Sequence, residues 1–187
     1  ADDLMQEMVD TSKSIAKDLG KLEGMSENQA DELYEIVGLG ALKYFMLKVD
    51  PKKRMMFDPK ESIDFNGNTG PFIQYTFARI QSLIVKYNSE ISEIKLVDIN
   101  KEEQTLIKHI LDFPSVIQEA ATNYSPALIA NYTYELVKEY NSFYQNTPVL
   151  NAENKDVKIF RVALSETVSS VVKNAMKLLG VEVPNQM

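Results

Sequence analysis

Apolar residues recur at three- and four-residue intervals along most of the chain, a pattern typical of helices that bury one face. Residues 2–22 carry such a stripe, and we expect Gly20 and Gly24 to end that helix. A capping box that begins at Ser26 opens a second helix, which the apolar stripe extends to about residue 48. The first quarter of the chain therefore predicts a pair of amphipathic helices.

The pattern changes in and after the second predicted helix. Gly38 and Gly40 permit either close packing against another helix or a break. Over 49–71 prolines and glycines recur and no helical period survives, although 55–57 could form a short extended segment. Irregular stretches of this length are usually functional or serve as linkers.

The remainder of the chain again predicts helices. We expect them over about 71–87, over 100–113 with a restart after Pro114 to about 123, over 126–146 and over 156–179, with a loop at 89–99. Pro71 and Pro126 suit the first turn of a helix, and Gly180 suits a helix C-cap. The sum is six or seven helices with little strand, so the predicted fold class is an all-α helix bundle.

Composition narrows the chemistry. The 187 residues contain no Cys and one His, which excludes disulfides, thiol catalysis and multi-His metal sites. The seven glycines form no phosphate-binding loop, and no apolar run is long enough to cross a bilayer. The net charge of −7 argues against nonspecific coating of nucleic acid. The first residues lack both an initiator Met and a basic stretch, so we expect no secretory signal and a chain cut from something larger.

Several polar residues have a functional and a simpler interpretation. His109 fits the edge of an amphipathic face better than a ligand role. Glu61, Asp64 and Glu90 could serve acid–base catalysis, but surface or capping roles are commoner. The basic cluster at 52–54 is either a solvated turn or a phosphate contact.

The most informative segment is 61–79, which runs from the irregular stretch into the third long helix. Phe72, Tyr75 and Arg79 recur there at i, i+3 and i+7, which places two rings and a guanidinium on one helix face. Core packing would explain both rings, but it explains the arginine less well. Flat rings beside an arginine are suited to unstacked RNA bases.

Four segments together resemble the arginyl-tRNA synthetase family. The first is 61–79, which matches the family pattern Glu-Ser-Ile-Asp-Phe, a glycine turn, Thr-Gly-Pro-aromatic, Gln-Tyr and Ala-Arg almost throughout. The others are 37–45, 126–136 and 178–187, which look like the preceding helix, the start of the long helix of the DALR-type domain, and the family's Leu-Gly-Ile-x-x-Pro-x-x-Met ending. Ser125 and Ile129 depart from the motif that names the domain, so no contact is assigned to either.

The resemblance implies a class I enzyme that joins arginine to its tRNA with ATP and Mg. The signatures of that class, His-Ile-Gly-His and Lys-Met-Ser-Lys-Ser, are absent from this chain. We therefore expect the chain to be the C-terminal portion of a longer parent enzyme, without catalytic residues, metal or cofactor of its own. Residues 1–70 would be the helical end of the catalytic domain with the junction loop, and 71–187 the anticodon-binding domain. The parent is expected to be cytoplasmic, monomeric and free of membrane contact.

The resemblance also implies the tRNA contacts. Every arginine anticodon has C in the middle, which gives the domain one invariant base to recognise. Phe72, Tyr75 and Arg79 match the family's ring and arginine positions in the first helix after the junction, and Met187 matches a position near the anticodon. Approximate alignment adds three residues, for which core packing is an equal alternative: Tyr140, Asn141 and Tyr144.

Other functions stay open at this point. The chain could be a helical protein-interaction module without an RNA role, or the equivalent domain of another class I synthetase, against which the segment 61–79 argues. If it binds tRNA, a local basic face must meet the phosphates, and binding should be weak and salt-sensitive. Candidates for that face are Lys52, Lys53, Arg54, Arg79 and Lys86.

Overall fold

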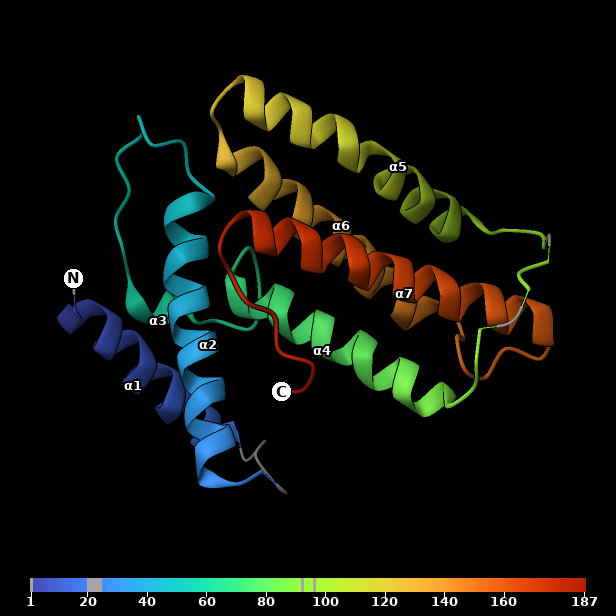
Figure 1. Cartoon of the computed structure of the whole chain (residues 1–187), viewed down its shortest axis with the longest axis horizontal. Helices are drawn as coiled ribbons and strands as arrows, with labels where there is room; N and C mark the ends of the chain where they lie inside the picture. The colour runs from blue at the N-terminus through green and yellow to red at the C-terminus, as the bar shows by residue number, and fades with distance from the viewer. Residues whose placement is uncertain (1, 20–24, 92, 96) are drawn as a thin grey trace.

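The structure, a computed structural model, describes residues 2–19, 25–91, 93–95 and 97–187. Within these ranges it contains seven helices and no strand, which confirms the predicted all-α class (Figure 1). The helices are α1 (Asp2–Leu19), α2 (Glu27–Leu47), α3 (Pro59–Ser62), α4 (Gly70–Tyr87), α5 (Lys101–Thr122), α6 (Pro126–Asn146) and α7 (Lys155–Leu178).

The last four long helices share the main core. α4 packs against α7, α5 packs against α6, and α6 and α7 join the two pairs (Figure 1). Their periodic apolar positions meet in one cluster that includes Phe77, Leu106, Leu136 and Val172. Burial of this apolar surface is the main force that holds the bundle together.

The first two helices form a smaller unit beside the bundle. α1 packs on α2, and α2 in turn packs on α4. A second, small core joins Met8 of α1 to Ala41, Leu42 and Ile63. A Cβ at Gly38 would lie 2.8 Å from the Met8 carbonyl oxygen, so the two backbones approach closely there. Of the two alternatives for this glycine, the structure therefore shows close packing within a continuous α2.

Capping residues in the sequence predicted most of the helix ends. The capping boxes that open at Ser26 and Asn100 are both formed. Leu179 is the C-cap of α7, and Gly180 follows it with a φ of +68°. The Val181 N–H donates to the Met176 carbonyl and the Gly180 N–H to that of Lys177, which is a Schellman motif. The predicted end of the first helix, at 20–24, lies outside the described residues.

Two predictions about helices were wrong. The helix that begins at Lys101 does not restart after Pro114 but runs through it, because the packing of α5 on α6 outweighs the one N–H that proline lacks. The stretch 49–71 is not wholly irregular, since Asp58 caps the single turn of α3 by accepting from the Lys60 and Glu61 N–H groups. One turn is too short to show an apolar period. Residues 55–57 form no strand.

Candidate nucleic-acid interface

The first turn of α4 is fixed by local hydrogen bonds. The Thr69 hydroxyl accepts from the Phe72 N–H and donates to the Asp64 carbonyl oxygen. Pro71 then occupies the first turn without the loss of a helical hydrogen bond. The glycine turn before α4 therefore sets the direction in which this helix presents its side chains.

The arginine of the predicted stripe lies beside two aromatic rings. The guanidinium carbon of Arg79 is 4.9 Å from the centroid of the Tyr75 ring and 5.6 Å from that of Tyr144 on α6. Both distances fall within the range of cation–π attraction. Tyr144 is 38% exposed, and Tyr75 and Arg79 are half-buried. The structure thus brings together residues from two helices, with ring and guanidinium surface that solvent can reach.

Asn141 connects this arginine to the backbone of α4. Its Oδ1 accepts from Nη1 of Arg79 at 2.7 Å, and its Nδ2 donates to the Thr76 hydroxyl at 2.9 Å. The Thr76 hydroxyl donates in turn to the Phe72 carbonyl oxygen at 3.0 Å. The arginine is therefore held in one orientation by a continuous chain of hydrogen bonds between α4 and α6.

Tyr140 lies one turn before Tyr144 on α6 but has a different environment. It is fully buried, with its ring packed on those of Phe143 and Tyr144. Burial raises the pKa of its hydroxyl to about 12. Of its two interpretations, core packing is the one that this structure shows, because the side chain has no exposed surface to offer a base.

Phe72 separates from the other two members of the stripe. Its ring lies 5.8 Å from that of Tyr134 on α6, and it packs partly against the main core. The Tyr75 ring instead meets Phe65 edge-on at 6.2 Å. We call the surface formed by Tyr75, Arg79 and Tyr144 the aromatic surface. Phe65 and Tyr134 extend it, although neither was predicted from the sequence. Tyr134 lies seven residues before Asn141, which places both on one face of α6. This spacing could have indicated Tyr134 from the sequence.

The tail after α7 returns to α4. The Gln74 amide donates to the Glu182 carbonyl oxygen at 2.8 Å, so this part of the tail lies against α4 (Figure 1). Met187 follows five residues later and is half-buried. The structure therefore places the predicted tail residue on a segment that runs beside the helix carrying Tyr75 and Arg79.

The other polar candidates lie elsewhere. Asp64 accepts from the Asn66 N–H at 2.9 Å and so stabilises a turn, while Glu61 and Glu90 are exposed. His109 lies in the middle of α5, half-buried, with its ring edge-on to that of Tyr132. The cluster at 52–54 is exposed in the loop after α2. In the described parts of the chain no group of three or more His, Asp or Glu residues could hold a metal ion, and no helix is long and apolar enough to cross a membrane.

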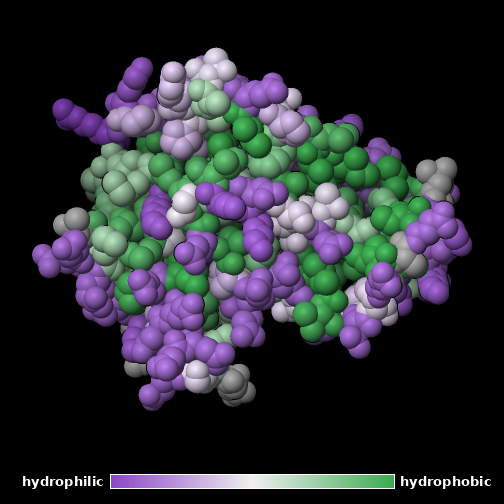
Figure 2. Space-filling model, viewed as in Figure 1, coloured by the Kyte–Doolittle hydropathy of each residue, from purple (hydrophilic) through white to green (hydrophobic). Residues whose placement is uncertain are grey.

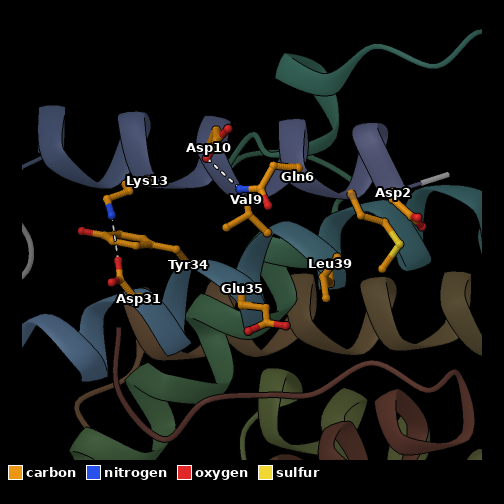
Figure 3. Close-up of a pocket in the computed structure, with 10 residues that line it drawn as sticks. Asp2, Gln6, Val9, Asp10, Lys13, Asp31, Tyr34, Glu35 and Leu39 are labelled. Carbon is orange, nitrogen blue, oxygen red and sulfur yellow. Dashed lines mark hydrogen bonds and ion pairs between the residues drawn. The ribbon is translucent and has the colours of Figure 1, made fainter.

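A groove between α1 and α2 has the wrong charge for RNA. Carboxylates line it, namely Asp2, Asp10, Asp31 and Glu35, and its one lysine, Lys13, already pairs with Asp31 at 2.7 Å (Figure 3). Hydrophilic residues also gather over the lower parts of these two helices in Figure 2, whereas more apolar surface shows over α5 to α7. A phosphate backbone would be repelled from this groove, which leaves the α4–α6 surface as the better candidate.

Comparisons with known proteins show which family the chain resembles. The family model described as "DALR anticodon binding domain" matches residues 73–187. Among curated proteins, an arginine–tRNA ligase of Flavobacterium psychrophilum is 57% identical over the whole chain, and one of Bacteroides thetaiotaomicron is 54% identical. The matches cover 31% and 32% of those relatives, so the chain spans about a third of their length.

Solved structures give the same result. Thermus thermophilus arginyl-tRNA synthetase superposes with a TM-score of 0.92 at 28% identity, over 100% of this chain and 32% of that one. The arginyl-tRNA synthetase of Plasmodium falciparum superposes with a TM-score of 0.86 at 26% identity, over 99% of this chain and 33% of that one. Since the family model matches well over half of the residues, the chain belongs to the DALR anticodon-binding domain family.

Proposed function

We propose that this chain recognises the anticodon loop of arginine tRNA as part of an arginine–tRNA ligase. The family and the printed names of the relatives support this assignment. The rival assignment to another class I synthetase has less support, because the two matched solved structures described above are both arginyl-tRNA synthetases.

The observation that carries the proposal is the position of Arg79 beside Tyr75 and Tyr144. An unstacked base gains about 1–3 kcal/mol from stacking on a protein ring. The middle C of the anticodon offers two acceptors on its pairing edge, and a guanidinium supplies only donors. We therefore assign stacking to Tyr75 and Tyr144 and edge recognition to Arg79, with Phe72 and Met187 as further contacts.

Asn141 takes a supporting role in this proposal, because both ends of its amide are already engaged within the protein. The phosphates of the loop would be met by cations near the aromatic surface, of which Lys86 lies on the same helix as Arg79. Such contacts make binding sensitive to salt, and the acidic residues elsewhere limit nonspecific binding.

The remaining assignments concern the full-length protein. We place residues 1–70 at the end of its catalytic domain and 71–187 in the anticodon-binding domain. The full-length protein would join arginine to tRNA in the cytoplasm, as a monomer, with ATP and Mg bound outside this chain. This chain itself contains neither class I signature nor a phosphate-binding glycine loop, so none of its residues is assigned to the ATP chemistry.

Titration of the 187-residue chain with arginine tRNA tests the proposal. The control is the same tRNA with its middle anticodon base changed, measured at the same salt concentration. We expect the variant to bind at least about tenfold more weakly, since a well-made base contact contributes about 1–3 kcal/mol. If neither RNA binds, the proposal fails, as the alternative of a protein-interaction module predicts. Equal binding of both would remove anticodon recognition.

A further inference from the structure

One buried amide joins three segments that are far apart in the sequence. Gln74 on α4 is fully buried. Its Nε2 donates to the Ile36 carbonyl oxygen of α2 at 3.1 Å and to the Glu182 carbonyl oxygen of the tail at 2.8 Å. A side-chain amide has two N–H donors, and here they serve two different segments. A hydrophobic residue of similar size would leave both carbonyls without this donor.

Two glycines leave room for the nitrogen end of the Gln74 amide. A Cβ at Gly40 would clash with Nε2 of Gln74, so any larger residue there would displace the amide. A Cβ at Gly70 would lie 2.9 Å from the Gly40 carbonyl oxygen. The two glycines let α2 and the start of α4 approach closely enough for the amide to reach across to α2.

A second bond ties the tail to α2. Nζ of Lys43 donates to the Gly180 carbonyl oxygen at 2.9 Å, at the point where the chain turns out of α7. Val181, between the two tethered carbonyls, is buried in the main core. Residues 180–182 are therefore fixed by α2 from one side and by α4 from the other.

We infer that Gln74, with Lys43, is a positioning residue that sets the path of the tail along α4 and so the position of Met187 at its end. The bonds from Gln74 and Lys43 to the tail are called the clamp below. The role of the clamp in RNA recognition rests on the proposed function, but the clamp itself does not. Because the same amide also bonds to the Ile36 carbonyl oxygen, the tail and α2 are held by one side chain. The clamp therefore fixes residues 180–182 of the tail relative to α2.

Hydrogen exchange of the backbone amides tests the clamp without RNA. In Gln74→Leu we expect exchange of the Val181 amide, whose N–H donates to the Met176 carbonyl oxygen, to accelerate by about tenfold, the scale of one lost hydrogen bond. The matched control is Gln81→Leu on the same helix, which should leave the tail unchanged. Lys43→Met, which leaves the core intact, should accelerate the tail as well. Unchanged tail exchange in both Gln74→Leu and Lys43→Met would overturn the clamp.

Binding of arginine tRNA then tests its purpose. Gln74→Leu should weaken binding by about fivefold to tenfold in the full chain, and it should have no further effect in a chain that ends at Pro184, because coupled residues are not additive. An equal loss in both backgrounds would show that Gln74 does not act through the tail. If the unaltered chain binds no tRNA, the proposed function and the role in RNA recognition both fail, while the exchange data still decide the clamp.

Discussion

Nη1 of Arg79 on α4 donates to Oδ1 of Asn141 on α6 at 2.7 Å, although 62 residues separate the two in the sequence. This bond holds a long side chain in one orientation before any ligand arrives. Much of the rotamer entropy that a free arginine would lose on binding is therefore lost already during folding. The pair therefore orients Arg79 on the candidate surface.

Removal of Tyr75 or Arg79, the two proposed contacts, should weaken recognition of tRNA. In the full-length protein we expect Tyr75→Ala or Arg79→Ala to lower kcat/KM for aminoacylation of arginine tRNA by tenfold or more, about 1.4 kcal/mol. Tyr124→Ala is the control, because Tyr124 is 90% exposed and lies at the α5–α6 connection. Unchanged kinetics in both variants would remove these residues from the site.

Asn141→Leu should act through Arg79. We expect it to weaken tRNA binding by the chain by roughly fivefold to tenfold, since the guanidinium loses its acceptor and regains rotamer freedom. The double variant Asn141→Leu, Arg79→Ala should bind no more weakly than Arg79→Ala alone. Additive losses would show instead that Asn141 makes an RNA contact of its own.

Loss of the Tyr44 hydroxyl should destabilise the chain. Its oxygen lies 2.6 Å from Oδ1 of Asn68 and 2.9 Å from the Ala130 carbonyl oxygen, and the side chain is fully buried. The hydroxyl has one proton, which these two acceptors share. Tyr44→Phe removes it, so we expect the free energy of unfolding to fall by about 1–3 kcal/mol. Urea unfolding at pH 8 measures this change, and a value near zero would mean that water satisfies the two acceptors.

Stability should also fall in alkaline solution. Burial raises the pKa of Tyr140 to about 12 in the folded chain, above its ordinary value of 10.0. The unfolded chain therefore loses this proton first, so the contribution is complete below pH 10 and declines as the pH rises through the folded pKa. Urea unfolding at pH 8 and pH 11 should show a smaller decline for Tyr140→Phe than for the unaltered chain. Equal declines would assign the effect to other groups.

The buried ion pair between Glu103 and Arg161 should contribute strongly to stability. Nε of Arg161 lies 2.6 Å from Oε1 of Glu103, whose other oxygen accepts from the Asn100 N–H in the capping box of α5. Glu103→Gln preserves a residue suited to the capping box but removes the charge, and we expect it to cost about 2–4 kcal/mol in urea unfolding. The control is Glu135→Gln, which breaks an exposed pair with Lys138 and should change little. Similar losses in both variants would contradict the special role of burial.

Gly38→Ala should separate α1 from α2. The added methyl meets the rigid backbone of Met8 at 2.8 Å, and relief of such a clash typically costs about 1–3 kcal/mol, more than the gain in helix propensity of up to about 1 kcal/mol. We expect faster hydrogen exchange in α1 with little change in α5 to α7. Gly67→Ala is the control, because nothing lies within 4 Å of its added methyl and only local strain at φ +78° results. Unaltered exchange in α1 would show that the two helices can shift at no cost.

The sequence by itself determined the features that depend on near neighbours. The capping boxes at Ser26 and Asn100, the turn at Gly180 and the apolar stripes all follow from interactions within a few residues, so they could be predicted together with the all-α class. The resemblance of residues 61–79 to one family also needed no coordinates. The predicted break at Pro114 was wrong, because the packing of α5 on α6 outweighs the local tendency of proline to end a helix.

Only the tertiary structure decided which partners the residues of the α4 stripe contact. Phe72 packs with Tyr134, whereas Tyr75 and Arg79 meet Tyr144 and Asn141. Tyr140 is buried and Tyr144 exposed, although one turn separates them, and the amide of Gln74 joins α2 to the tail. Periodicity shows which residues share a helix face, but the contacts of that face depend on how distant helices cross, and the crossing is set by the packing of the whole core.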